Sequence, residues 1–175
     1  VSDTEPTRPE LDPHRAGDRE TTILLVDDDQ SWATSTAEIL EHQRETFSVR
    51  TATEIDAAVE AFEAVDPDCV VSDYQLTRGT GLDLLDEVRD RTPERPFVLI
   101  TGQGDERLAS DAIAREVTDY IPKRSLGRRG DLLARRVETA VESYRTQRAL
   151  DRERRSKNAM LDVLTATADS GELAQ

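Results

Sequence analysis

Five short apolar runs, each followed by a stretch with helical periodicity, constrain the fold of this chain more than any other feature. The runs are TILLV from Thr22, FSVRTA from Phe47, DCVVSD from Asp68, PFVLIT from Pro96 and TDYIP from Thr118. Most are apolar on consecutive positions, which is typical of strands that are buried on both faces. Because parallel strands need crossover connections, a helix after each strand fits a parallel sheet. The pattern therefore predicts an α/β fold, a doubly wound five-stranded parallel sheet of the flavodoxin-like order 2-1-3-4-5.

The helices are expected at residues 31–41, 54–65, 81–91 and 105–116, with a long last helix from about Asp131. In the first and third of these, apolar residues recur at helical spacing and are predicted to pack on the sheet. They are Ala33, Ala37, Leu40, Leu82, Leu85 and Val88.

The chain divides into three segments. Residues 1–20 carry prolines among charged residues without a periodic apolar face, which is the composition of a disordered leader. Residues 21–144 hold the alternating strands and helices, and residues 145–175 are predicted to form a helical extension or linker. The extension begins almost wholly polar, and apolar residues return at Met160. A solvated helix, a paired helix and a connection into a further domain all fit that pattern.

Charge and composition exclude several function classes. The chain has 37 acidic and 23 basic residues, and its net charge of -14 would repel the phosphates of nucleic acid. The basic residues concentrate between Arg128 and Lys157, where an anionic partner could still bind, but residues 145–175 are too few for an ordinary DNA-reading domain. No apolar stretch approaches the roughly 20 residues that cross a bilayer. With one cysteine, Cys69, and no signal-like segment, a cytoplasmic protein is expected.

Carboxylates gather at the expected carboxyl ends of the strands. Asp27, Asp28 and Asp29 follow the first strand, and Asp73 ends the third. Because these strands are neighbours in the predicted order, their carboxylates should converge at the edge where open parallel sheets bind ligands. A hard dication would relieve the repulsion, and Mg²⁺ needs only one or two carboxylates besides its waters. The sequence therefore predicts a magnesium site, whereas Asp29 alone is better explained as the N-cap of the next helix.

Asp73 is also a candidate phosphoacceptor. A carboxylate can take a phosphoryl group when a metal ion and a nearby cation neutralise the transferring oxygens. Lys123, one of only two lysines, follows the fifth strand and would be that cation, while the Thr101 hydroxyl could hydrogen-bond a phosphoryl oxygen. The glycine-rich segments at 79–81 and 102–104 lack the Lys-Ser/Thr of a P-loop, so both are interpreted as flexible loops.

Together, the segments ILLVDDD, VVSDYQLTRGTG, VLITGQG and TDYIPK resemble the receiver domain of two-component response regulators. The likeness runs from about residue 22 to 144. In that family a sensor histidine kinase donates a phosphoryl group to the aspartate that ends the third strand, which is Asp73 here. The resemblance implies a phosphorelay protein that is not an enzyme, apart from slow removal of its own phosphoryl group.

The resemblance also implies a ligand set for Mg²⁺. Asp28 and Asp73 would bind the ion directly, Asp27 would assist through a water molecule, and the main-chain carbonyl of Gln75 would complete the protein ligands.

A switch is implied as well. Thr101 and Lys123 match the conserved hydroxyl and lysine of the family, and Tyr120 matches its aromatic switch position. A phosphoryl group adds about two negative charges, which would draw Thr101 inward and vacate space for Tyr120. In similar proteins the altered face comprises helix four, strand five and helix five. Here a homodimer or a downstream protein is expected to use that face and the C-terminal helix.

The chain departs from the family pattern at two positions. Thr77 stands where a proline is usual, so the loop after Asp73 is expected to differ in shape. Arg124 follows Lys123 in place of a proline with a cis bond. A cis bond before another residue costs roughly 3 kcal/mol, so this bond is expected to be trans unless its surroundings hold it cis.

Two alternatives stay open from the sequence. One is a receiver-like binding module that works without phosphate. The other is a phosphohydrolase resembling the haloacid dehalogenase superfamily, with Asp27 as nucleophile and Asp29 as its companion. The second alternative leaves Asp73 without a role.

Overall fold

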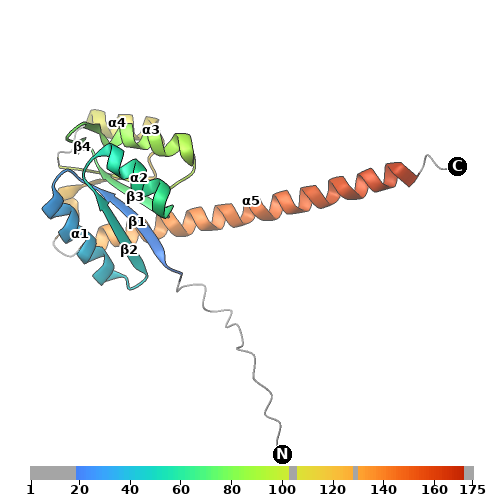
Figure 1. Ribbon diagram of the computed structural model, residues 1–175, viewed down its shortest axis with the longest axis horizontal. Helices are drawn as coiled ribbons and strands as arrows, with labels where there is room; N and C mark the ends of the chain where they lie inside the picture. Colours follow the sequence, from blue (N-terminus) through green and yellow to red (C-terminus); the bar gives the residue numbers. More distant parts are fainter. Residues whose placement is uncertain (1–18, 103–105, 128–129, 172–175) are drawn as a thin grey trace, which may run out of the picture.

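A parallel sheet with five strands forms the centre of the computed structural model, which describes residues 19–102, 106–127 and 130–171 (Figure 1). Its strands are β1 (Thr21–Val26), β2 (Phe47–Ala52), β3 (Cys69–Asp73), β6 (Phe97–Thr101) and β7 (Asp119–Pro122). They lie in the order β2-β1-β3-β6-β7, and all neighbours are parallel. The predicted order 2-1-3-4-5 is thus confirmed, because β4 (Gln75–Leu76) and β5 (Gly79–Thr80) form a separate antiparallel hairpin.

Helices cover both faces of the sheet. They are α1 (Gln30–Gln43), α2 (Ile55–Val65), α3 (Gly81–Arg91), α4 (Glu106–Ala114) and α5 (Asp131–Gly171), with a 3₁₀ turn at Lys123–Ser125. One hydrophobic cluster joins α1 and α5 to the sheet, and a second joins α2, α3 and α4 to the opposite face. The doubly wound prediction is therefore confirmed.

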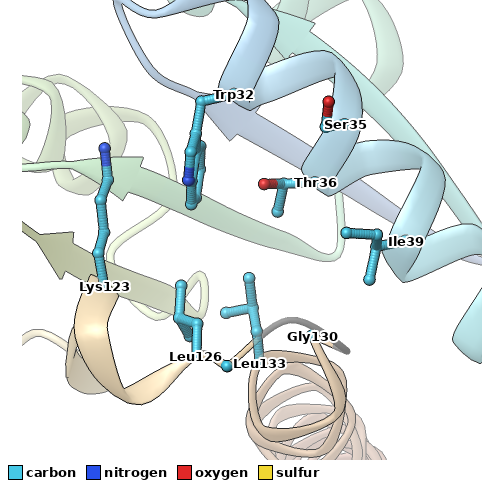
Figure 2. A pocket seen from close by; sticks show the side chains of 9 residues that line it. Trp32, Ser35, Thr36, Ile39, Lys123, Leu126, Gly130 and Leu133 are labelled. Carbon is cyan, nitrogen blue, oxygen red and sulfur yellow. The ribbon is translucent and has the colours of Figure 1, made fainter.

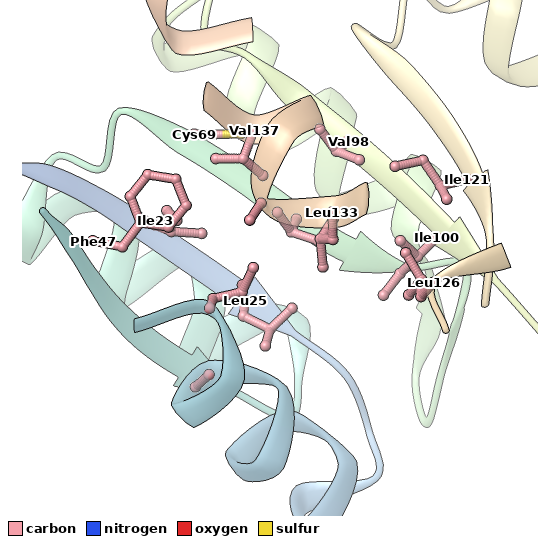
Figure 3. Close-up of a cluster of buried hydrophobic side chains, with 14 of the residues drawn as sticks. Ile23, Leu25, Phe47, Cys69, Val98, Ile100, Ile121, Leu126, Leu133 and Val137 are labelled. Carbon is pink, nitrogen blue, oxygen red and sulfur yellow. The ribbon is translucent and has the colours of Figure 1, made fainter. Parts of the chain in front are cut away.

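Strand β1 shows why the apolar runs are consecutive. Ile23 and Leu25 belong to the cluster under α1 and α5, whereas Leu24 and Val26 belong to the other, and all four are fully buried. Figure 3 shows Leu133 from α5 packed in the same cluster as Ile23 and Leu25. Burying each large aliphatic side chain contributes about 1.5–3 kcal/mol. The six helical residues predicted to pack on the sheet are all buried.

The interpretation of residues 79–81 as a flexible loop is wrong. Gly79 and Thr80 form β5, and Thr80 caps α3. The Thr80 N–H donates to the Asp83 carboxylate at 2.7 Å, and the Asp83 N–H donates to the Thr80 hydroxyl at 3.3 Å. This reciprocal capping box fixes the start of α3 directly after the hairpin. Of the other glycine-rich segment, residues 103 and 104 lie outside the described residues.

Helix α5 has two parts. Leu133, Val137 and Val141 are buried against the sheet. From residue 146 to residue 161 the side chains are almost all exposed, and this later part of the helix projects away from the body (Figure 1). Arg145 holds α5 to the body where the projecting part begins, because its guanidinium donates to the Glu20 carbonyl and pairs with Asp68, each at 3.0 Å. Among its described side chains, the projecting part exposes the large apolar ones of Leu150, Met160 and Leu161.

Two further features bear on the predicted segments. Residues 1–18, most of the predicted leader, lie outside the described residues. Within the part of the chain that the structure describes, none of the helices has the length and apolar character that crossing a membrane requires.

Candidate functional site

The strand ends bring three carboxylates together. The register of β1 against β3 sets Val26 beside Ser72, so Asp27 and Asp73 leave the sheet side by side. Asp27, Asp28 and Asp73 each offer an oxygen, and these oxygens lie within 4.8 Å of one another. Asp27 is fully buried and Asp73 is 6% exposed, whereas Asp28 faces solvent. The cluster therefore opens to solvent on the side of Asp28.

Lys123 closes the inner side of this cluster. Its Nζ donates to Asp27 Oδ2 at 2.7 Å and to Asp73 Oδ2 at 2.9 Å. The lysine begins the 3₁₀ turn that follows β7, at the same edge of the sheet as the two aspartates. The peptide bond between Lys123 and Arg124 is trans. The side chain thus reaches both carboxylates without a cis bond.

The electrostatics of the cluster favour an additional cation. Burial raises the pKa of Asp27, although the hydrogen bonds from Lys123 and from the Asp29 N–H act in the opposite direction. Burial lowers the pKa of Lys123, but its hydrogen bonds to Asp27 and Asp73 outweigh this, and the net pKa is raised. One ammonium therefore faces three carboxylates, which leaves an excess of negative charge.

An unsatisfied oxygen marks where that cation fits. Asp73 Oδ1 is buried and has no hydrogen-bond partner among the described residues. A buried acceptor without a partner costs about 1–3 kcal/mol. A dication among oxygen ligands that include this atom and the exposed carboxylate of Asp28 would remove that cost, and Mg²⁺ accepts such a mixed set of carboxylates and waters. The residues present therefore fit a magnesium ion.

Asp29 has a different task, as its position after the strand predicts. It is the N-cap of α1, and its Oδ1 accepts from the N–H groups of Ser31 and Trp32, each at 3.0 Å. A cap of this kind contributes about 1 kcal/mol. Because its carboxylate is used in this way, Asp29 is a poor companion for Asp27 in a dehalogenase-like site.

The remaining predicted residues surround the cluster. Thr101 ends β6 and is 3% exposed. Tyr120 lies in β7 and packs against the cluster under α2, α3 and α4, and its buried hydroxyl has no partner among the described residues. Gln75 is exposed at the start of β4, two residues after Asp73. The ligand role of its main-chain carbonyl stays a prediction, as does the switch role of Tyr120.

Sequence reasoning missed one residue of the site, Trp32. Its indole ring lies in the first turn of α1, and the Lys123 Nζ stands 4.4 Å from the ring centroid. The available signal was the presence of the only tryptophan of the chain three residues after Asp29.

Comparison with known proteins decides the family. Residues 23–135, well over half of the chain, match the response regulator receiver domain. The chain belongs to this family. Receiver domains of response regulators act in two-component systems, and the predicted family is thereby confirmed.

Individual relatives agree with this assignment. The nitrogen assimilation regulatory protein NtrX of Azorhizobium caulinodans is 37% identical over 128 residues, which cover 72% of this chain and 27% of NtrX. The photosynthetic apparatus regulatory protein RegA of Rhodobacter capsulatus is 32% identical over 102 residues, which cover 58% of this chain and 54% of RegA. The crystal structure of NtrX from Brucella abortus superposes with a TM-score of 0.67 at 34% identity, and the match covers 75% of this chain and 29% of that one. The chain thus spans between about a quarter and a half of the length of these relatives.

Proposed function

We propose that this receiver domain accepts a phosphoryl group on Asp73 from the phosphohistidine of a sensor histidine kinase, and that the phosphoryl group switches a surface for partner binding. The observation that carries the proposal is the state of the Asp73 carboxylate. It is almost fully buried at a strand end. Its Oδ2 accepts a hydrogen bond from Lys123, and its Oδ1 has no partner among the described residues. In the transfer, an Asp73 oxygen forms a bond to phosphorus while the P–N bond to the kinase imidazole breaks and its electron pair leaves with the imidazole.

The chain's own residues would hold Mg²⁺ at this place. Asp28 and Asp73 would be its direct carboxylate ligands, Asp27 would assist through water, and the Gln75 main-chain carbonyl would complete the protein ligands. When bound, the ion neutralises negative charge that the phosphoryl oxygens bring. The crowding of the three carboxylates within 4.8 Å of one another supports this assignment.

Lys123 and Thr101 bind the incoming group. Lys123 donates to Asp73 Oδ2 beforehand, so a small movement of its ammonium would bring it to a phosphoryl oxygen. The hydroxyl of Thr101, at the end of β6, would donate to another. The inward movement of Thr101 would leave room for the Tyr120 ring. This ring is half-buried and its hydroxyl has no partner among the described residues, which suits a side chain that changes between two conformations.

The surface that responds comprises α4, β7 and α5. Ile113 on α4 is 74% exposed, an apolar side chain on the face that would change. Helix α5 continues from this face into the projecting part, whose Leu150 and Met160 are also exposed. A second copy of the chain or a downstream protein would bind there. The free thiol of Cys69 is compatible with the cytoplasm, where we place this exchange.

Phosphorylation from a small donor tests the proposal. The protein is incubated with acetyl phosphate and Mg²⁺, and its intact mass is measured. The wild-type chain should gain the mass of one phosphoryl group, and Asp73→Asn should gain none. No gain in the wild type would reject phosphoacceptor function, and an unchanged gain in Asp73→Asn would move the phosphoryl group to another residue, such as Asp27 in a dehalogenase-like enzyme.

A pair of neighbouring substitutions tests the metal ligands. Mg²⁺ at a hundred times its dissociation constant should stabilise the wild-type domain by about 2.7 kcal/mol, because it binds only the folded state. Asp28→Asn should lose most of this gain, since it removes a charged ligand. Asp29→Asn should keep it, because asparagine caps a helix as well as aspartate does. The measurement is urea unfolding with and without Mg²⁺, and equal losses in the two variants would contradict the ligand assignment.

A further inference from the structure

The Lys123 ammonium has an aromatic neighbour besides its two carboxylates. Its Nζ lies 4.4 Å from the centroid of the Trp32 ring, well within the roughly 6 Å at which a cation and an aromatic face attract each other. Figure 2 shows the Lys123 side chain extended beside the indole. An ammonium has three N–H donors. Two of them bind Asp27 and Asp73, and the indole ring contacts the ammonium on a side that the carboxylates leave uncovered.

Trp32 is itself held in place. Its backbone N–H donates to Asp29 Oδ1 at 3.0 Å, which fixes the first turn of α1. Its ring is partly buried against the hydrophobic cluster of α1, α5 and the sheet. A lysine side chain, by contrast, has a flexible four-carbon stem, and that of Lys123 is 23% exposed. A fixed ring beside a flexible cation limits the positions that the cation can take.

We propose that Trp32 is a positioning residue that keeps the Lys123 ammonium beside the buried carboxylates of Asp27 and Asp73 while its hydrogen-bond partners change. The inference rests on the proposed function, because the change of partners is the transfer of Lys123 from Asp73 Oδ2 to a phosphoryl oxygen. During that exchange the ammonium loses one carboxylate contact. The indole face stays in contact and keeps the ammonium from turning out into solvent.

The local cavity decides which substitutions are informative. Trp32 and Lys123 both line a cavity of about 280 Å³ between α1 and the start of α5, together with Ile39, Leu126 and Leu133 (Figure 2). An alanine at position 32 would enlarge this cavity and confuse loss of packing with loss of the aromatic face. Trp32→Leu keeps an apolar side chain but removes the π face, and Trp32→Phe keeps a smaller π face. The leucine and phenylalanine variants are therefore the matched pair.

The position of the Lys123 side chain beside the Trp32 ring can be tested without phosphorylating the protein. The chain has only two lysines, so selective ¹³C labelling of lysine gives two Cε–Hε signals in an NMR spectrum. The Lys123 signal should be shifted upfield by the indole ring, whereas Lys157, paired with Glu153 on the projecting part of α5, serves as reference. In Trp32→Leu the upfield shift should vanish. A Lys123 signal at the reference position in the wild type would overturn the inference.

The role is tested by the initial rate of phosphorylation from acetyl phosphate at saturating Mg²⁺. Trp32→Leu should be slower by roughly two- to thirtyfold, the range that a cation–π contact of this kind supports, and Trp32→Phe should recover most of the rate. A purely structural role predicts equal rates for the two variants at equal melting temperature, which would overturn the inference. If the wild type takes no phosphoryl group at all, the proposed function fails, and with it the role in exchange, while the NMR result still decides the placement of Lys123.

Discussion

Gly81→Ala is expected to destabilise the domain by about 1–3 kcal/mol, and by more if the sheet cannot adjust. A Cβ at position 81 would press against the main-chain carbonyl oxygen of Asp73 and lie 2.7 Å from Leu99 Cδ1. The Gly81 N–H also donates to the carbonyl of Tyr74, the residue after β3, at 2.8 Å, which ties the start of α3 to this strand end. A flexible side chain could move aside, but a backbone oxygen cannot move without the strand. The substitution should therefore displace the phosphoacceptor itself.

Urea unfolding measures the loss of unfolding free energy in Gly81→Ala. The rate of phosphorylation from acetyl phosphate reports whether Asp73 is displaced. Gly102→Ala is the matched control, because a Cβ at position 102 would meet no atom of the described residues within 4 Å, and Gly102 also follows a strand end. The control should stay within about 0.5 kcal/mol of the wild type, as surface substitutions usually do. Similar losses in Gly81→Ala and Gly102→Ala would show that the close contact with β3 is not what requires a glycine at position 81.

The sheet could be predicted because its signal is redundant. Ile23, Leu24, Leu25 and Val26 point alternately to two faces, and only a strand covered on both sides buries all of them. Once the strands are known, right-handed crossovers with helices on both faces narrow the order to a few doubly wound arrangements, of which 2-1-3-4-5 is one. The convergence of Asp27 and Asp73 then follows from the adjacency of β1 and β3. The residues of the candidate site that lie at strand ends could therefore be predicted from the sequence.

The contacts within the segments that connect strands and helices could not be predicted from the sequence in the same way. The hairpin of β4 and β5 has two residues in each strand, too few to show any periodicity. The Thr80–Asp83 capping box did have a sequence signal, the spacing of a hydroxyl and a carboxylate three residues apart, but two flanking glycines favoured a loop. The contact between Trp32 and Lys123 joins the first helix to the turn after the last strand. No local pattern reports such a contact.

Arg95 shows the same limit at the opposite end of the sheet. Its side chain is almost fully buried and pairs with Asp66 at 2.5 Å. The guanidinium also lies 5.6 Å from the ring centroids of Phe62 in α2 and Tyr144 in α5. An arginine next to prolines in sequence is typical of an exposed turn, whereas here it joins two helices that pack on opposite faces. Its burial depends on partners from two segments that are far apart in the sequence, and only the folded chain brings them together.

Lys123→Met should cost about 3 kcal/mol of unfolding free energy at neutral pH without metal. Breaking a buried ion pair leaves its partner charge uncompensated, and Asp27 is fully buried beside a second carboxylate. The estimate takes the low end of the usual range because Lys123 is partly exposed. Lys157→Met is the matched control, since Lys157 pairs with Glu153 in solvent and should change stability by less than about 1 kcal/mol.

The dependence of this loss on pH identifies its cause. Burial raises the pKa of Asp27 above 3.8, so the folded state binds this proton more tightly than the unfolded chain does. The contribution of Asp27 to stability therefore falls as the pH rises through its raised pKa, and it recovers on acidification. Removing Lys123 takes away a hydrogen bond that lowers this pKa, so the recovery in Lys123→Met should begin at a higher pH than in the wild type. In unfolding experiments between pH 4 and 8, the difference in unfolding free energy between Lys123→Met and the wild type should become smaller toward acid. Adding Asp27→Asn to Lys123→Met should remove most of this difference. A gap that is the same at every pH would mean that Lys123 stabilises the fold by packing alone, and the carboxylates would then not need its charge.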